Sequence, residues 1–155
     1  MYDDLRELYQ EVILEHGKHP RNRRQPAGCN RHALGRNPVC GDAFVIYLTV
    51  DDDGVVRDCG FKGEGCAISM ASASMMSEIV KGKTLDEARR LFETFHGMAT
   101  GDGEAVDTDG LDEDDLDRLQ ALSGVRRFPI RVKCATLAWH TMQAAMDGVN
   151  EISTE

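Results

Sequence analysis

Three cysteines lie far apart in the chain, each in a short distinctive segment. This pattern restricts the folds that the chain can adopt. Cys40 lies in Asn-Pro-Val-Cys-Gly-Asp at 37–42, Cys66 follows Gly-Glu-Gly, and Cys134 comes 68 residues later. With Asp42, three thiolates and one carboxylate make a complete tetrahedral ligand set for zinc. The same thiols could instead hold an iron–sulfur cluster or carry sulfur. A shared site requires a fold that brings the three segments together.

The spacing alone leaves these alternatives open. The sequence has no Cys-x-x-Cys pair, and the gaps between the three cysteines are not those of a zinc finger. The residue types therefore fit either a metal or cluster site or a set of unrelated reduced thiols. Arg131 and Lys133, close to Cys134, would offset the negative charge of a metal site; the alternative is that both are solvated residues at a helix start.

Length and composition predict an ordinary globular protein. A chain of 155 residues suggests one domain. Its size allows a core that needs no metal for stability, and no apolar run approaches the ~20 residues of a membrane span. The acidic, amphipathic start predicts no signal peptide, so we expect a cytoplasmic protein. In that compartment thiols stay reduced, which favours metal binding or catalysis over disulfides.

The net charge of −9 comes from one segment. Nine of the 27 acidic residues lie between 102 and 117 with no basic residue among them, and the other 18 balance the 18 basic residues. This distribution argues against general nucleic-acid binding. Residues 17–41 show the opposite asymmetry, with six basic residues and no acid. They form either a solvated basic loop or a docking surface for an acidic partner.

The first half of the chain predicts a helix, a long loop and two strands. A helical apolar face is followed by Gly17 and Pro20, which end the helix, and 17–37 then reads as a surface loop. Residues 43–50 alternate with period two, 51–54 form a turn, and 55–61 return antiparallel. Cys59 falls in this second strand and is expected to be a small buried hydrophobe.

The second half predicts helices. After a glycine-bearing turn at 62–65, Cys66 stands at the N-terminus of a helix that runs to about residue 80, where the helix dipole favours a thiolate. Thr84 and Glu87 form a capping box for the next helix. A glycine-rich acidic loop is expected at 97–110 and a short helix at 111–122. Pro129 precedes the last helix, which places Cys134 in or near its first turn.

Several segments together resemble the IscU/NifU N-terminal-domain family of iron–sulfur assembly proteins. The segments are 37–42, 63–74 and 131–139, with His-Pro-Arg-Asn at 19–22 as a further match, and the resemblance extends over about 2–148. The SufU branch is the most similar. Lys133 stands where the IscU branch has a histidine, the loop around 97–116 is an insertion that the IscU branch lacks, and the Leu-Pro-Pro-Val-Lys chaperone motif is absent.

The resemblance implies a fold and a function. The implied fold is α+β, with a small three-stranded antiparallel sheet flanked by about five helices, in one domain over 1–155 with an acidic insertion at about 97–116. The implied activity is zinc-dependent acceptance of persulfide sulfur from a pyridoxal-phosphate cysteine desulfurase of SufS type, for iron–sulfur cluster assembly with other SUF proteins. No nucleic-acid or membrane partner is expected, and the chain would act as a sulfurtransferase-like partner rather than a stand-alone enzyme.

The same resemblance implies roles for individual residues. Zinc would be held by Cys40, Asp42, Cys66 and Cys134. Cys40 would be the sulfur acceptor. Charge support by Arg131 is expected from its place near Cys134 in the sequence, not from the resemblance. In the alternative function, a scaffold assembles and transfers a [2Fe–2S] cluster on the same four residues; a third hypothesis is a structural zinc module that binds partners. Cys29 has no place in the family pattern and is expected to be an incidental surface thiol.

Overall fold

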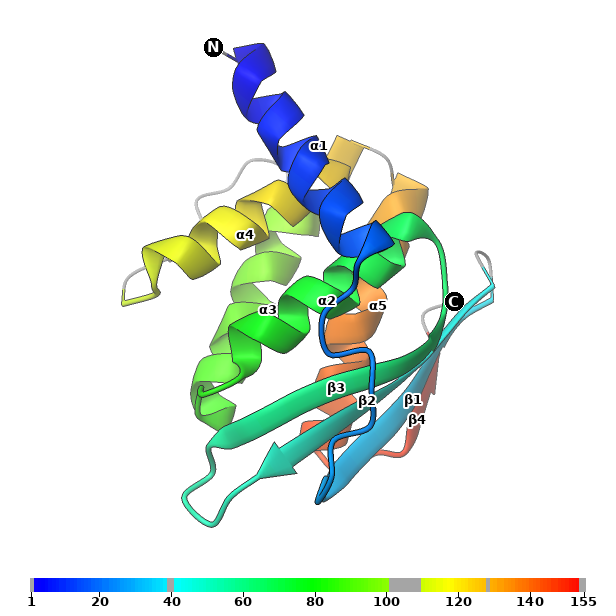
Figure 1. Ribbon diagram of the computed structural model, residues 1–155, viewed down its shortest axis with the longest axis vertical. Helices are drawn as coiled ribbons and strands as arrows, with labels where there is room; N and C mark the ends of the chain where they lie inside the picture. The colour runs from blue at the N-terminus through cyan, green and yellow to red at the C-terminus, as the bar shows by residue number, and fades with distance from the viewer. Residues whose placement is uncertain (1, 39–40, 101–109, 128, 154–155) are drawn as a thin grey trace.

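A four-stranded mixed sheet carries its helices on one face in the computed structural model (Figure 1), which describes residues 2–38, 41–100, 110–127 and 129–153. The elements in chain order are α1 (Tyr2–Lys18), β1 (Arg31–Asn37), β2 (Asp42–Val50), β3 (Val56–Glu64), α2 (Ala67–Val80), α3 (Leu85–Thr100), α4 (Glu113–Ser123), η1 (Gly124–Arg127), α5 (Pro129–Met146) and β4 (Glu151–Ser153). No helix among these residues is both long and apolar enough to cross a bilayer.

The expectation of three antiparallel strands is wrong in number and in pairing. The strand order is β3-β2-β1-β4; β2 runs antiparallel to both its neighbours, whereas β4 pairs parallel to β1. The α+β class and the returning strand pair β2–β3 are confirmed. Along β2 every second residue is buried from Asp42 to Val50, as the period-two pattern predicts.

Helices α2 and α5 lie against the sheet and build the core with it. α5 packs on β1 and β2, and α2 on β3, while α1 crosses α2 on the side away from the sheet (Figure 1). Leu137, Ala138 and Thr141 of α5 are buried, as are Met70, Met75 and Met76 of α2. The capping box is also confirmed, because Thr84 and Glu87 exchange hydrogen bonds of 3.1 Å. These contacts hold the start of β2 beside the ends of two helices.

The predicted surface loop at 17–37 is too long, because its last seven residues form β1. The remaining loop packs along β3: the Phe61 N–H donates to the carbonyl of Asn22 at 3.0 Å, and Arg24 forms an ion pair with Asp58 at 2.9 Å. Covering an edge strand in this way removes a site of unwanted strand pairing. Arg21 and Arg36 also reach acidic residues of the chain, so part of the basic run is engaged within the fold.

The predicted acidic loop at 97–110 begins too early and the acidic run is partly helical. α3 continues through Gly97 to Thr100, while 101–109 lie outside the described residues. Asp112 is the N-cap of α4, and its carboxylate accepts from the N–H groups of Asp114 and Asp115. Acidic residues in a first helical turn are favoured by the helix dipole. These charges therefore stabilise a helix start.

Candidate metal centre

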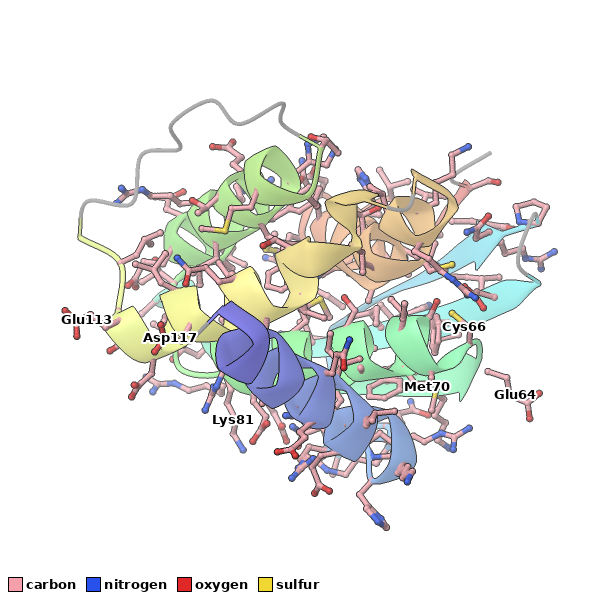
Figure 2. The ribbon with its side chains drawn as sticks, turned by 90° about the horizontal axis from the view of Figure 1, so that it is seen from above. Glu64, Cys66, Met70, Lys81, Glu113 and Asp117 are labelled. Carbon is pink, nitrogen blue, oxygen red and sulfur yellow. The ribbon has the colours of Figure 1, made fainter. Side chains whose placement is uncertain are left out.

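Three of the four predicted ligands converge. One carboxylate oxygen of Asp42 and the sulfurs of Cys66 and Cys134 all lie within 4.8 Å of one another. They come from the start of β2, the N-terminus of α2 and the second turn of α5. Figure 2 shows Cys66 at the end of α2 that lies away from Glu113 and Asp117 of α4. The fourth predicted ligand, Cys40, lies outside the described residues.

Asp42 is fixed by the first turn of α2. Its side chain is buried, with 2% of the residue exposed. Oδ1 accepts a hydrogen bond of 2.9 Å from the backbone N–H of Cys66, and Oδ2 accepts one from the Ser69 hydroxyl. Gly41 precedes Asp42 with φ 74°, and its N–H donates to the Asn37 carbonyl at 2.9 Å. A glycine there allows the left-handed backbone that this turn requires.

Cys66 is the N-cap of α2. Its sulfur accepts from the Ser69 N–H at 3.5 Å and lies 3.4 Å from the Ser69 hydroxyl. Burial, the largest single influence, raises the pKa of the Cys66 thiol. The hydrogen bonds from Ser69, with a smaller one from Cys134, outweigh burial and the nearby charge of Asp42, so that the pKa lies below its usual value. The predicted position of Cys66 at a helix N-terminus, where a thiolate is stabilised, is confirmed.

Gly65 allows the close packing of this corner. A Cβ at this position would stand 2.8 Å from Asp42 Oδ1 and 2.8 Å from Cζ of Phe44. Real Cβ atoms do not approach other atoms so closely, so any larger residue would displace the carboxylate or the turn. The glycine before Cys66 therefore lets the thiol and the carboxylate lie side by side.

Cys134 reaches the site from deeper in its helix than predicted. α5 begins at Pro129, which is a favoured first helical residue, so Cys134 falls in the second turn and not at the N-terminus. The residue is fully buried. Next to it, the Ala135 carbonyl accepts from the Ser72 hydroxyl, and Ser72 accepts from Trp139 Nε1 at 3.1 Å. These bonds fix α5 against α2. Because Cys134 is not at a helix N-terminus, stabilisation of a thiolate by the helix dipole applies only to Cys66.

Asn37 adds a buried amide beside the site that nothing in the sequence singled out. It pairs with Asp42 across the β1–β2 ladder and is fully buried. Neither its amide nitrogen nor its amide oxygen has a hydrogen-bond partner within the described part of the chain. Ser69 was likewise missed. The sequence carried no signal for it, because its partner Asp42 lies on a different element.

The remaining candidate residues differ in exposure. Arg131 is exposed in the first turn of α5 and Lys133 is exposed nearby, so charge support by Arg131 stays a prediction. Cys59 is fully buried in β3, as expected, and burial raises its pKa to about 12. Cys29 is half-buried in the loop before β1.

The donor set fits a metal ion. Asp42 is a buried carboxylate, and no ion pair joins it to a basic side chain among the residues described. Buried charges in proteins are usually paired or coordinate a metal. Sulfur and carboxylate ligands at about 2.0–2.3 Å from a tetrahedral zinc ion stand within about 4 Å of each other, close to the separation observed. A divalent cation would therefore offset much of the negative charge of the group, with small side-chain movements.

The chain is similar in sequence and in fold to known proteins. The family described as NifU-like N terminal domain matches residues 8–135. The chain is 41% identical over 143 residues to the zinc-dependent sulfurtransferase SufU of Bacillus subtilis, covering 90% of each chain. It is 39% identical over 142 residues to the iron-sulfur cluster assembly scaffold protein IscU of Streptococcus pyogenes, covering 92% of this chain and 84% of the relative.

Two solved structures have the same architecture. One is a candidate iron–sulfur cluster assembly scaffold protein for the SUF system from Fervidobacterium islandicum, with a TM-score of 0.79, 30% identity, and coverage of 90% of this chain and 97% of the other. The second is a NifU-like protein from Brucella abortus, with a TM-score of 0.78, 25% identity, and coverage of 92% and 94%.

Proposed function

Since the chain belongs to the family of NifU-like N-terminal domains, we propose that it takes part in iron–sulfur cluster assembly as a zinc-dependent acceptor of sulfur. The sulfur donor is a cysteine desulfurase of SufS type, working with other SUF proteins. The observation that carries the proposal is the convergence of Asp42, Cys66 and Cys134 within 4.8 Å. The relative from Bacillus subtilis, named as a zinc-dependent sulfurtransferase, supports zinc as the metal and sulfur as the cargo.

Zinc would be held by Cys40, Asp42, Cys66 and Cys134. When bound, zinc stabilises thiolates without redox chemistry of its own. The chain's own residues prepare the site for this ion. The hydrogen bond from the Ser69 N–H favours the Cys66 thiolate, and the Cys66 N–H and the Ser69 hydroxyl orient the Asp42 carboxylate. Arg131, exposed near the start of α5, would offset part of the remaining negative charge.

Sulfur acceptance is a displacement at the terminal sulfur of the donor persulfide, with the Cys40 thiolate as the nucleophile. The Cys40 thiolate attacks the terminal sulfur of the desulfurase cysteine persulfide, in the manner of thiol–disulfide exchange. The new bond joins the Cys40 sulfur to that terminal sulfur. The bond between the terminal sulfur and the desulfurase cysteine breaks, and its electron pair leaves with the desulfurase cysteine as a thiolate. No oxidant or reductant is consumed, and Cys40 carries the persulfide onward.

A desulfurase assay tests this function. Zinc-loaded chain added to a SufS-type desulfurase should raise cysteine turnover, and mass spectrometry should find one added sulfur atom on Cys40. The Cys40→Ala variant should abolish both effects, whereas Cys29→Ala, which removes a thiol outside the site, should preserve both. Full stimulation by Cys40→Ala would reject the acceptor role.

A scaffold for a [2Fe–2S] cluster is the second candidate, because the relatives from Streptococcus pyogenes and Fervidobacterium islandicum carry scaffold names. The cluster would be cargo on the same four residues. Anaerobic reconstitution followed by absorption spectroscopy separates the two functions. A stable cluster that displaces zinc and passes to an apo-protein would favour the scaffold.

A further inference from the structure

We infer that Ser69 is a positioning residue of the metal centre: its hydroxyl holds the Asp42 carboxylate in the orientation in which it binds metal. The inference rests on the proposed function, since it presumes a metal at Asp42, Cys66 and Cys134. It adds a residue whose side chain is not a ligand in the proposed set. Ser69 itself is buried, with 1% of the residue exposed.

The carboxylate of Asp42 completes a helix cap from outside the helix. In a capping box, the side chain of the third helical residue reaches back to the N–H of the N-cap residue. Here Cys66 is the N-cap and Ser69 the third residue, but a serine is too short to reach back. Asp42 bridges the gap: it accepts from the N–H of Cys66 and from the hydroxyl of Ser69, one bond to each oxygen.

These two bonds fix the rotation of the carboxylate. With only the Cys66 bond to Oδ1, the group could turn about its last side-chain torsion, which has a broad, soft energy profile. The Ser69 bond to Oδ2 removes that freedom. A carboxylate oxygen has more than one acceptor site, so each oxygen can still bind a cation. Partners that orient metal ligands in this way are worth about 10- to 100-fold in metal affinity.

The other serines of α2 bond elsewhere. Ser72 joins the helix to α5 through Ala135 and Trp139. Ser74 joins it to His16 and to the N–H of Arg21, and Ser77 is bonded by the Asn22 amide. The partners of the Ser69 hydroxyl are the carboxylate of Asp42 and the sulfur of Cys66. Its hydroxyl therefore contacts two candidate ligands directly.

The test measures zinc affinity by competition with a chromophoric chelator. Ser69→Ala should weaken zinc binding by about 10- to 100-fold. Ser74→Ala, which removes a buried hydroxyl from the same helix away from the site, should change it by less than about threefold. Ser69→Thr and Ser69→Val form an isosteric pair. Ser69→Thr should retain the zinc affinity because it keeps the hydroxyl, whereas Ser69→Val should weaken zinc binding. This pair distinguishes an effect of the hydroxyl from an effect of packing, even if Ser69→Ala does not fold.

A double-mutant cycle identifies the residue through which Ser69 acts. In an Asp42→Ala background, Ser69→Ala should weaken zinc binding by less than about threefold more, because the carboxylate that it positions is gone. In cobalt-loaded Ser69→Ala, the ligand-field bands should shift because the oxygen ligand is displaced. The sulfur-to-cobalt charge-transfer intensity should stay unchanged because the number of sulfur ligands is the same.

Two results would overturn the inference and leave the proposed function intact. In the first, Ser69→Ala binds zinc as tightly as the wild type. In the second, Ser69→Ala weakens zinc binding by the same factor in the Asp42→Ala background as in the wild type. A wild-type chain that binds no zinc would overturn the zinc-dependent function and the inference together.

Discussion

Asn37 and Asp42 are direct partners across the β1–β2 pair, and both side chains are buried. They differ in how their polar atoms are satisfied. Both carboxylate oxygens of Asp42 accept hydrogen bonds from α2, whereas neither amide atom of Asn37 has a partner among the described residues. A buried polar group without a partner lowers stability. Asn37 is therefore a costly residue beside the candidate metal centre.

Replacing Asn37 by valine should stabilise the metal-free protein. The change removes an unpaired buried amide from a strand, and the free energy of unfolding should rise by about 1–3 kcal/mol. Urea unfolding in the presence of a chelator measures it. The matched control is Asn30→Val, because the Asn30 amide exchanges hydrogen bonds of 2.7 and 2.9 Å with Val50 and its loss should destabilise. Equal destabilisation by both variants would contradict the account.

Cys59 should be inert toward alkylation in the folded chain. It is fully buried in β3, and burial, with Asp58 adding to it, raises its pKa to about 12. At pH 8, iodoacetamide should modify Cys59 at least about a hundredfold more slowly than the half-buried Cys29, because the thiolate is the reactive form. Peptide mapping by mass spectrometry of the metal-free protein gives both rates. Comparable rates would show that the β3 thiol is accessible.

His16 should make stability depend on pH. Its Nδ1 lies 2.7 Å from the Ser74 hydroxyl, and burial first, then Arg21, lowers its pKa below 6.5. The unfolded chain therefore binds the proton more readily. The free energy of unfolding should keep the full His16 contribution above about pH 6.5 and lose it as pH falls through the lower, folded-state pKa.

The His16→Gln variant tests that pH dependence. Urea unfolding between pH 7.5 and 5, with chelator present, should show a shallower fall than in the wild type. Some slope should remain because burial and His96 also lower the pKa of His140. His19→Gln, a change at an exposed histidine in the following loop, is the control. An unchanged slope in His16→Gln would refute the assignment.

A methyl group at Gly65 should damage the metal centre. In Gly65→Ala the new Cβ would meet Asp42 Oδ1 and Phe44 Cζ at 2.8 Å, so we expect zinc affinity to fall by about tenfold or more. Gly124→Ala is the matched control, since nothing lies within 4 Å of a Cβ there. Chelator competition measures both variants. Equal affinities in the two would mean that the corner around Gly65 relaxes without moving the carboxylate.

β2 could be predicted from the sequence because its alternating large apolar residues face the core. β1 could not be predicted, because its core-facing positions include the small residues Ala33 and Gly35. The reason lies in tertiary packing: a Cβ at Gly35 would stand 1.8 Å from the Thr141 hydroxyl of α5. The close approach of α5 requires small residues and so removes the hydrophobic signal. β4 has three residues and pairs parallel with a strand far away in sequence, which no local pattern indicates.

The candidate site also has residues that the sequence predicts and residues that it does not. The convergence of Asp42, Cys66 and Cys134 could be expected from their residue types together with the family resemblance, because few residue types bind metals. The depth of Cys134 in α5 was not, since it depends on whether Pro129 begins the helix or precedes it. Ser69 and Asn37 carry no distinctive chemistry as residue types. Their importance comes from partners on other elements, which only the assembled fold brings to them.

X-ray absorption spectroscopy of the zinc-loaded chain tests the central claim most directly. If Cys40, Asp42, Cys66 and Cys134 bind one ion, the zinc should have three sulfur neighbours at about 2.3 Å and one oxygen at about 2.0–2.2 Å. The Cys66→Ala variant should lose one sulfur neighbour, and Asp42→Ala should change the oxygen shell alone. A zinc ion surrounded by oxygen and nitrogen only, or a sulfur count that Cys66→Ala leaves unchanged, would contradict the account.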